Sequence, residues 1–133
     1  MIVLDASVVV ELLTNGPWAE SIRSDLASCD DSMIVPHLLD VEVLSALRRL
    51  VAGRRLDPHR SEQMLAGVAA LPAERFPAIP LFSRIWELRH NFTAYDAAYI
   101  ALAEATDSRL YTCDEKLSKG HRAEVVLFGP PYA

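Results

Sequence analysis

The chain has 133 residues, of which 51% are hydrophobic, and a formal net charge of −5. This length and apolar content fit a single domain over residues 1–133 with a sizeable core. The negative charge argues against a general nucleic-acid binder, whose affinity usually comes from a basic surface. The apolar N-terminal stretch is interrupted by Asp5 and Glu11 and follows no basic region, so it predicts neither a signal peptide nor a membrane span. We therefore expect a cytoplasmic protein.

The first part of the chain predicts a strand followed by two helices. Residues 2–5 are β-branched or apolar and too few for a buried helix, and Asp5 closes this run. Ser7 is a candidate N-cap for a helix that extends to about Thr14. The Gly16-Pro17 pair is expected to end that helix before a second one begins.

The middle of the chain repeats this order of elements. A second strand is expected over residues 33–35, followed by a long helix from about Leu38 to Gly53. Asp57-Pro58 predicts the N-cap and first position of another helix. The next strand is expected over residues 76–79, and because its Pro77 cannot donate a ladder hydrogen bond, we place it at an edge of the sheet.

The last part of the chain predicts an amphipathic helix around residues 81–88 and then a helix capped by Thr93. A strand over residues 109–112 and a final strand over 124–128 follow, and the tail from Gly129 is expected to be irregular. Strands thus alternate with helices throughout. This alternation predicts an α/β fold, in which helices cover both faces of a central parallel sheet and the crossovers are right-handed.

Four acids recur at corresponding ends of these strand–helix units. Asp5 ends the first strand, Asp114 follows the strand over 109–112, and Glu42 and Asp96 lie on predicted helices. Ligands of such sheets bind beyond the carboxyl ends of the strands. Two carboxylates about 5 Å apart repel by roughly 3 kcal/mol at an effective dielectric of 20, so a cluster of four needs protons or cations. Because no His or Cys accompanies the pattern, Mg²⁺ or Mn²⁺ is the natural ion.

Each acid also has an ordinary structural explanation. Asp5 and Asp114 can cap the helices that follow them, and Asp96 can complete a capping box with Thr93. Glu42 can be a surface residue.

The helix geometry around Glu42 separates it from a neighbouring acid. Glu42 shares a helix face with Leu38, Ser45, Ala46 and Arg49. Asp40 lies roughly 160° around the same helix, so we do not expect it to reach the same ion.

The two cysteines, Cys29 and Cys113, are far apart and show no CxxC spacing, which predicts reduced thiols rather than a zinc site or a disulfide framework. Strand alternation is expected to point Cys113 away from the acids.

At these residues the sequence resembles the PIN-domain ribonucleases, and within them the VapC-type toxins of type II toxin–antitoxin pairs. The resemblance covers nearly the whole chain and is carried by the segments IVLDASVVVELL, PHLLDVEVLSALRR, FTAYDAAYIALAE and LYTCDEKL. It implies a compact three-layer α/β/α domain that cleaves RNA with Mg²⁺ or Mn²⁺. The matching ligand and catalytic positions are Asp5, Glu42, Asp96 and Asp114. Ser7 and Thr112 match small hydroxyl positions, which we expect to orient a carboxylate or a water, although Ser7 can equally be a helix cap.

The resemblance also implies a mechanism and partners. A water activated by metal and a nearby carboxylate would attack phosphorus in line, with one ion or two. Asp5, Asp96 and Asp114 are the first choices as direct ligands, whereas Glu42 can ligate, bind through water or serve as the general base. A VapB-type antitoxin is expected to cover the active-site groove, and the chain is expected to form a homodimer and to bind no membrane. Basic side chains that can steer RNA, or simply form a solvated surface, are Arg48, Arg49, Arg54, Arg55, Lys116, Lys119 and Arg122.

Two other functions stay open from the sequence. The first is a non-catalytic RNA-binding or regulatory module on the same fold. The second is phosphotransfer with Asp5 as the nucleophile, as in haloacid-dehalogenase-like enzymes, although such a site needs a second acid where Ser7 stands. No GxGxxG or glycine-rich phosphate loop is present, so nucleotide-cofactor functions have no support.

Overall fold

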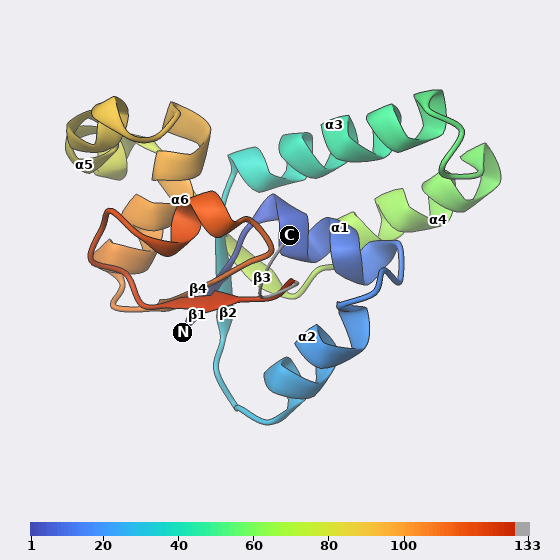
Figure 1. The fold of residues 1–133 in the computed structure, drawn as a ribbon, viewed down its shortest axis with the longest axis horizontal. Coiled ribbons are helices and arrows are strands. Elements are labelled where there is room, and N and C mark those ends of the chain that lie inside the picture. The colour runs from blue at the N-terminus through green and yellow to red at the C-terminus, as the bar shows by residue number, and fades with distance from the viewer. Residues whose placement is uncertain (130–133) are drawn as a thin grey trace.

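The computed structural model describes residues 1–129, and the predicted irregular tail lies, from residue 130 on, outside the described residues. Five parallel strands form one sheet in the order β3-β2-β1-β4-β5 (Figure 1). The strands are β1 (Ile2–Leu4), β2 (Met33–Pro36), β3 (Ala73–Phe76), β4 (Arg109–Thr112) and β5 (Val125–Leu127). The helices are α1 (Ala6–Leu13), α2 (Ala19–Ala27), α3 (Leu38–Ala52), α4 (Pro58–Ala69), α5 (Phe82–Glu87) and α6 (Ala94–Ala105), with short 3₁₀ helices η1 (Ile79–Leu81), η2 (Leu88–His90) and η3 (Glu115–Ser118). The predicted parallel α/β fold is therefore confirmed.

β1 lies in the centre of the sheet and marks the point where the strand order reverses. Its Ile2 pairs with Met33 of β2 on one side and with Arg109 of β4 on the other. In open parallel sheets such a reversal leaves a crevice beyond the carboxyl ends of the two diverging strands. The ends of β1 and β4 therefore define where a ligand site is expected.

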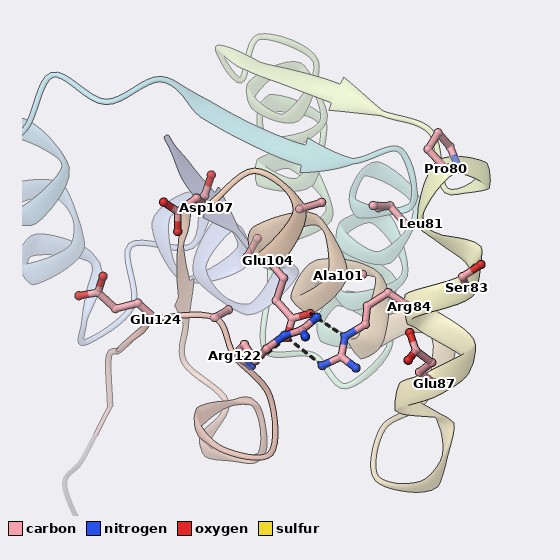
Figure 2. Close-up of a pocket in the computed structure, with 14 residues that line it drawn as sticks. Pro80, Leu81, Ser83, Arg84, Glu87, Ala101, Glu104, Asp107, Arg122 and Glu124 are labelled. Atoms are coloured by element: carbon pink, nitrogen blue, oxygen red, sulfur yellow. Dashed lines mark hydrogen bonds and ion pairs between the residues drawn. The ribbon is translucent and has the colours of Figure 1, made fainter.

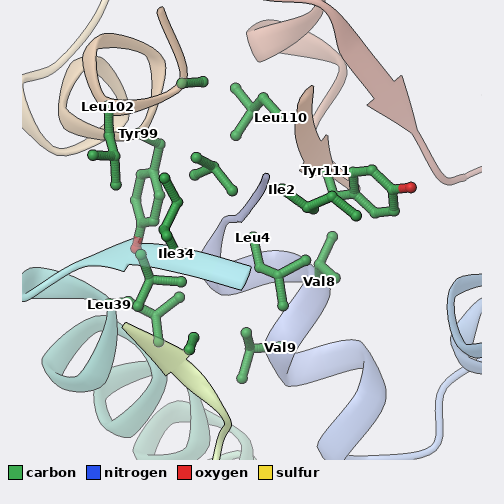
Figure 3. Close-up of a cluster of buried hydrophobic side chains, with 14 of the residues drawn as sticks. Ile2, Leu4, Val8, Val9, Ile34, Leu39, Tyr99, Leu102, Leu110 and Tyr111 are labelled. Carbon is green, nitrogen blue, oxygen red and sulfur yellow. The ribbon is translucent and has the colours of Figure 1, made fainter. Parts of the chain in front are cut away.

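Helices cover both faces of this sheet and fix its position. α6 packs across β1, β2 and β4, while α1 contacts β4, α2 and α3. Figure 3 shows Tyr99 and Leu102 of α6 on one side of the strands, and Val8 and Val9 of α1 on the other. All four side chains are buried. Burying one such aliphatic side chain contributes about 1.5–3 kcal/mol, so the core holds the two helices firmly against the central strands.

Local capping explains where the helices beside the central strands begin. The Thr93 side chain accepts a hydrogen bond from the backbone N–H of Asp96 at 3.1 Å and starts α6, as predicted. Asp5 is the N-cap of α1, because its Oδ1 accepts from the backbone N–H of Val8 at 3.1 Å. The prediction that Ser7 caps this helix is wrong, since Ser7 lies inside the first turn.

The third strand forms at the predicted edge of the sheet but three residues early. β3 ends at Phe76, which pairs with Pro36 at the end of β2. Pro77 follows this last pair, so its missing N–H removes no ladder hydrogen bond. The predicted helix over residues 81–88 is divided into η1, α5 and η2.

Two further expectations from the sequence concern the cysteines and a membrane span. Cys29 and Cys113 are both free thiols. Across residues 1–129, no helix combines the length and the apolar character needed to cross a bilayer.

Candidate metal centre

All four predicted acids line one cavity of about 480 Å³. Asp5 and Asp114 come from the ends of β1 and β4, Glu42 from α3 and Asp96 from the first turn of α6. The remaining lining residues are Ala6, Ser7, Val10, Glu11, Ala46, Arg49, Tyr99 and Cys113. The fold thus brings together acids that lie as far apart in sequence as residues 5 and 114.

Asp5 is the most deeply placed of these acids, with only 5% of its surface exposed. Burial raises the pKa of its carboxyl group to about 6, and the charge of Asp114 acts in the same direction. Hydrogen bonds from Ser7, Thr112 and the backbone N–H of Val8 lower the pKa but do not cancel the effect of burial. The site therefore keeps a carboxylate that is costly to ionise without a compensating cation.

Two hydroxyl groups connect Asp5 to the end of β4. Ser7 Oγ donates to Asp5 Oδ1 at 2.6 Å and accepts from the backbone N–H of Cys113 at 2.9 Å. Thr112 Oγ1 donates to Asp5 Oδ2 and accepts from the backbone N–H of Asp114 at 2.9 Å. Because each hydroxyl has one proton and gives it to Asp5, the two side chains fix both carboxylate oxygens.

Glu42 receives a hydrogen bond from a residue that the sequence analysis did not single out. The Tyr99 hydroxyl donates to Glu42 Oε1 at 2.6 Å. Burial raises the pKa of Glu42, the Tyr99 hydrogen bond lowers it, and the charge of Asp96 raises it. Burial is the largest cause that raises the pKa of the Tyr99 hydroxyl well above its ordinary value, and the neighbouring Glu42 raises it further. The phenol therefore stays protonated. The sequence did contain a signal for Tyr99, because it lies three positions after Asp96 and so shares a helix face with that acid.

Asp96 and Asp114 are half-buried and lie near enough to influence one another. Burial raises the pKa of Asp96, the charge of Asp114 raises it further, and Lys116 opposes both. Asp114 Oδ1 also accepts from the backbone N–H of Lys116 at 3.0 Å, which caps η3. The capping explanations given to Asp5 and Asp114 are thus correct, and both acids line the cavity while they cap.

Cys113 corrects another expectation, because it lines the acid cavity. β4 ends at Thr112, so the alternation of a regular strand no longer sets the direction of the next side chain. Burial raises the pKa of the Cys113 thiol to about 11, and the charges of Asp5 and Glu11 contribute. The thiol is therefore protonated and unreactive near neutral pH.

The basic side chains proposed to steer RNA are all exposed, but they lie in different places. Arg49 lines the acid cavity and Lys116 influences Asp96. Arg48 lines a different, apolar cavity, and Arg122 pairs with Glu104 at 3.4 Å. Only part of the basic set therefore faces the acids.

Asp40 lies away from the acid cavity, as its helix position predicted. Its carboxylate pairs with the Arg75 guanidinium, with Nη2 of Arg75 2.9 Å from Oδ1.

A larger cavity, of about 600 Å³, lies between α5, α6 and the segment before β5. Its centre is Glu104, which pairs with Arg84 at 2.6 Å and with Arg122 at 3.4 Å (Figure 2). Because these charges neutralise one another, this cavity shows structural ion pairing rather than a cluster of like charges that demands a ligand. The smaller cavity is the better candidate.

The donor set of the smaller cavity suits a hard divalent cation. The candidate ligands in it are carboxylates, and the pKa values of three of them are raised by burial and by neighbouring acids. Among residues 1–129, no three His, Cys, Asp or Glu side chains are grouped closely enough to form a ready-made cage. The acids therefore share a cavity whose chemistry fits Mg²⁺ or Mn²⁺, and their role as ligands stays a prediction.

The fold and the site define an α/β protein with converging carboxylates at the switch point of a parallel sheet. The PIN domain family model matches residues 2–122. Ribonuclease VapC9 of Mycobacterium tuberculosis is 41% identical over 124 residues, covering 93% of this chain and 94% of that protein. Ribonuclease VapC12 of the same species is 37% identical over 129 residues, covering 96% and 98%. This chain therefore belongs to the PIN-domain family and, within it, to the VapC-type ribonuclease toxins.

A solved structure, a toxin–antitoxin complex from Klebsiella pneumoniae, matches the fold with a TM-score of 0.66 at 16% identity, covering 95% of this chain and 96% of that one. The predicted resemblance and the predicted three-layer architecture are both confirmed.

Proposed function

We propose that this chain is the endoribonuclease toxin of a toxin–antitoxin pair, which hydrolyses RNA phosphodiester bonds and so inhibits translation and growth. The observation that carries the proposal is the convergence of Asp5, Glu42, Asp96 and Asp114 on one cavity. Its VapC relatives, named as ribonucleases, support RNA as the substrate. The cytoplasm, as the compartment of that RNA, stays a prediction.

Asp5, Asp96 and Asp114 would hold Mg²⁺ or Mn²⁺, and Glu42 would complete the set as a ligand, directly or through water, or act as the general base. When bound, the cation would stabilise developing charge on the phosphate and lower the pKa of a water. Neutralising the acids would also offset the cost of ionising Asp5 at the bottom of the cavity.

The remaining chemistry belongs to the chain itself. Burial raises the pKa of Glu42, and a carboxylate with a raised pKa is a stronger proton acceptor for an attacking water. Ser7 and Thr112 hold Asp5 by hydrogen bonds. Arg49 lines the same cavity and can contact an RNA phosphate.

An antitoxin is proposed as the partner, and the Klebsiella complex supports a pairing of this kind. A third cavity, of about 500 Å³, runs between α3 and α4. Its lining is mainly apolar and includes Leu44, Val51 and Leu65, with Arg48 at its margin. Such a groove suits the apolar face of an antitoxin helix.

A homodimer is also proposed. Several large apolar side chains stay exposed outside the groove, and exposed apolar surface, when contiguous, is typical of a protein–protein interface. They are Val41, Ile79, Phe82, Trp86 and Tyr95. Sedimentation of the purified chain tests the proposal, since Trp86→Ser should shift a dimer towards monomer.

Cleavage of total cellular RNA by the purified, antitoxin-free chain tests the enzymatic proposal. We expect discrete products in Mn²⁺ that disappear in EDTA and in Asp96→Asn. Asp107→Asn is the matched control, because Asp107 follows α6 and lines the Glu104 cavity instead. Folded wild-type protein that binds Mn²⁺ but cleaves nothing would favour the non-catalytic RNA-binding module.

A further inference from the structure

We infer that Tyr99 is a positioning residue for the proposed nuclease, whose buried hydroxyl fixes the Glu42 carboxylate in the acid cavity. This inference rests on the proposed function. It starts from the 2.6 Å hydrogen bond between Tyr99 Oη and Glu42 Oε1, which joins α6 to α3 across 57 residues of sequence. No other hydrogen-bond donor to Glu42 is found among residues 1–129.

The position of the Tyr99 hydroxyl is set by the core. Only 2% of the residue is exposed, and it belongs to the fully buried stretch of α6 from Ala97 to Ala103. Figure 3 shows its ring beside Ile34 of β2 and above Leu39 of α3. A ring held on its sides by packed side chains has little rotational freedom, so its hydroxyl is a fixed donor.

Glu42 needs such a donor more than Asp5 does. It is half-buried, and its side chain has three rotatable bonds, whose ordering costs conformational entropy. Asp5 is held by two hydroxyls and a backbone N–H, whereas Glu42 has the phenol alone. Removing the Tyr99 hydroxyl would therefore leave the Glu42 side chain free to rotate, while Asp5 would stay in place.

The hydrogen bond also gives the two carboxylate oxygens of Glu42 different roles. The phenol has one proton and gives it to Oε1, which leaves Oε2 for a cation or a water. Tyr99 would therefore act on the reaction only through Glu42, without touching RNA. Outer hydrogen-bond partners of metal ligands commonly change metal affinity or activity by about 10–100-fold when they are removed.

The test is Tyr99→Phe in the full chain, with Mn²⁺ binding measured by titration calorimetry and RNA cleavage measured beside it. Tyr111→Phe is a matched control, because Tyr111 is another buried phenol that donates to a carboxylate, here Asp25 of α2. We expect Tyr99→Phe to weaken Mn²⁺ binding or cleavage by about 10–100-fold and Tyr111→Phe to leave both unchanged. Equal behaviour of the two variants would overturn the inference.

A double-mutant cycle separates positioning from a general packing effect. If Tyr99 acts through Glu42, adding Tyr99→Phe to Glu42→Gln should cause little further loss. The same loss in both backgrounds would overturn the inference and show that Tyr99 acts by another route. A failure of the proposed function is distinguishable, because it would appear in the wild type as absent Mn²⁺ binding or absent cleavage.

Discussion

Thr112, at the end of β4, donates a hydrogen bond to the carboxylate of Asp5, 107 residues earlier at the end of β1. The same hydroxyl accepts from the backbone N–H of Asp114. One side chain thus fixes the relative position of two proposed metal ligands on neighbouring strands.

Thr112→Val keeps the side-chain shape but removes this hydroxyl. We expect the variant to lose about 1–3 kcal/mol of unfolding free energy at neutral pH, because a buried carboxylate and a backbone N–H both lose a partner. Urea unfolding measures the loss. Thr112→Ser retains the hydroxyl and should recover most of the stability, and equal losses in the two variants would show that the methyl group, not the hydrogen bond, matters.

The stability of cation-free protein should fall as the pH rises from about 4 to about 7. Burial raises the pKa of folded Asp5 to about 6 from 3.8, so the folded state holds its proton more tightly than the unfolded state. The contribution of Asp5 is therefore complete below the unfolded pKa and is lost as the pH passes through 6, by about 3 kcal/mol at most. Urea unfolding in EDTA measures this slope, and Asp5→Asn should flatten it. An unchanged slope in the variant would refute the assignment to Asp5.

Glu104 should show the opposite dependence on pH. Burial alone raises its pKa, but the hydrogen bond from Arg84, and then Arg122, outweigh burial and hold the pKa at about 2 (Figure 2). This stabilisation is present above the unfolded pKa of 4.5 and is lost as the pH falls through 2. Glu104→Gln should therefore cost about 1.5–3 kcal/mol at pH 7 and less in acid. Arg122→Gln, at the exposed end of the network, should cost less than about 1 kcal/mol.

Mn²⁺ or Mg²⁺ should raise the melting temperature of the wild-type chain. A cation that binds only the folded state adds about 2.7 kcal/mol at a concentration 100 times its Kd. Asp5→Asn should weaken this response, because the variant loses one proposed ligand and part of the repulsion that the cation relieves. Asp107→Asn should respond like the wild type. A full response in Asp5→Asn would count against the proposed site.

Leu65→Glu should weaken antitoxin binding without reducing RNA cleavage by the free toxin. Leu65 lines the apolar groove between α3 and α4 and is 45% exposed, so a charge there disturbs the groove more than the core. Co-purification with the proposed cognate antitoxin measures binding. Leu127→Glu is the control, because this leucine is 42% exposed on the edge strand β5. Equal capture by both variants would place the antitoxin elsewhere.

Much of the fold was predictable because its signals lie within single elements. The apolar run before Asp5 gives a strand, and Thr93 caps α6. The helical period likewise placed Glu42 on the face that lines the cavity and Asp40 off it. These features depend on contacts within a few residues, which the sequence shows directly.

The misplaced predictions occur where an element ends. Asp5, and not Ser7, caps α1, because the helix already begins at Ala6 and Asp5 is the single residue between it and β1. Cys113 turned towards the acids because β4 had already ended at Thr112. At such boundaries two periodicities compete, and backbone contacts with neighbouring elements decide between them.

The sequence by itself determined the order of strands and helices, the acids at their ends and the family resemblance. Only the tertiary structure showed that Tyr99 donates to Glu42 and that Thr112 connects Asp5 with Asp114. The reason is physical: periodicity and capping act over a few residues along the chain, whereas these hydrogen bonds join side chains on separate elements. Their geometry exists only after α3, α6 and the central strands have packed into one core.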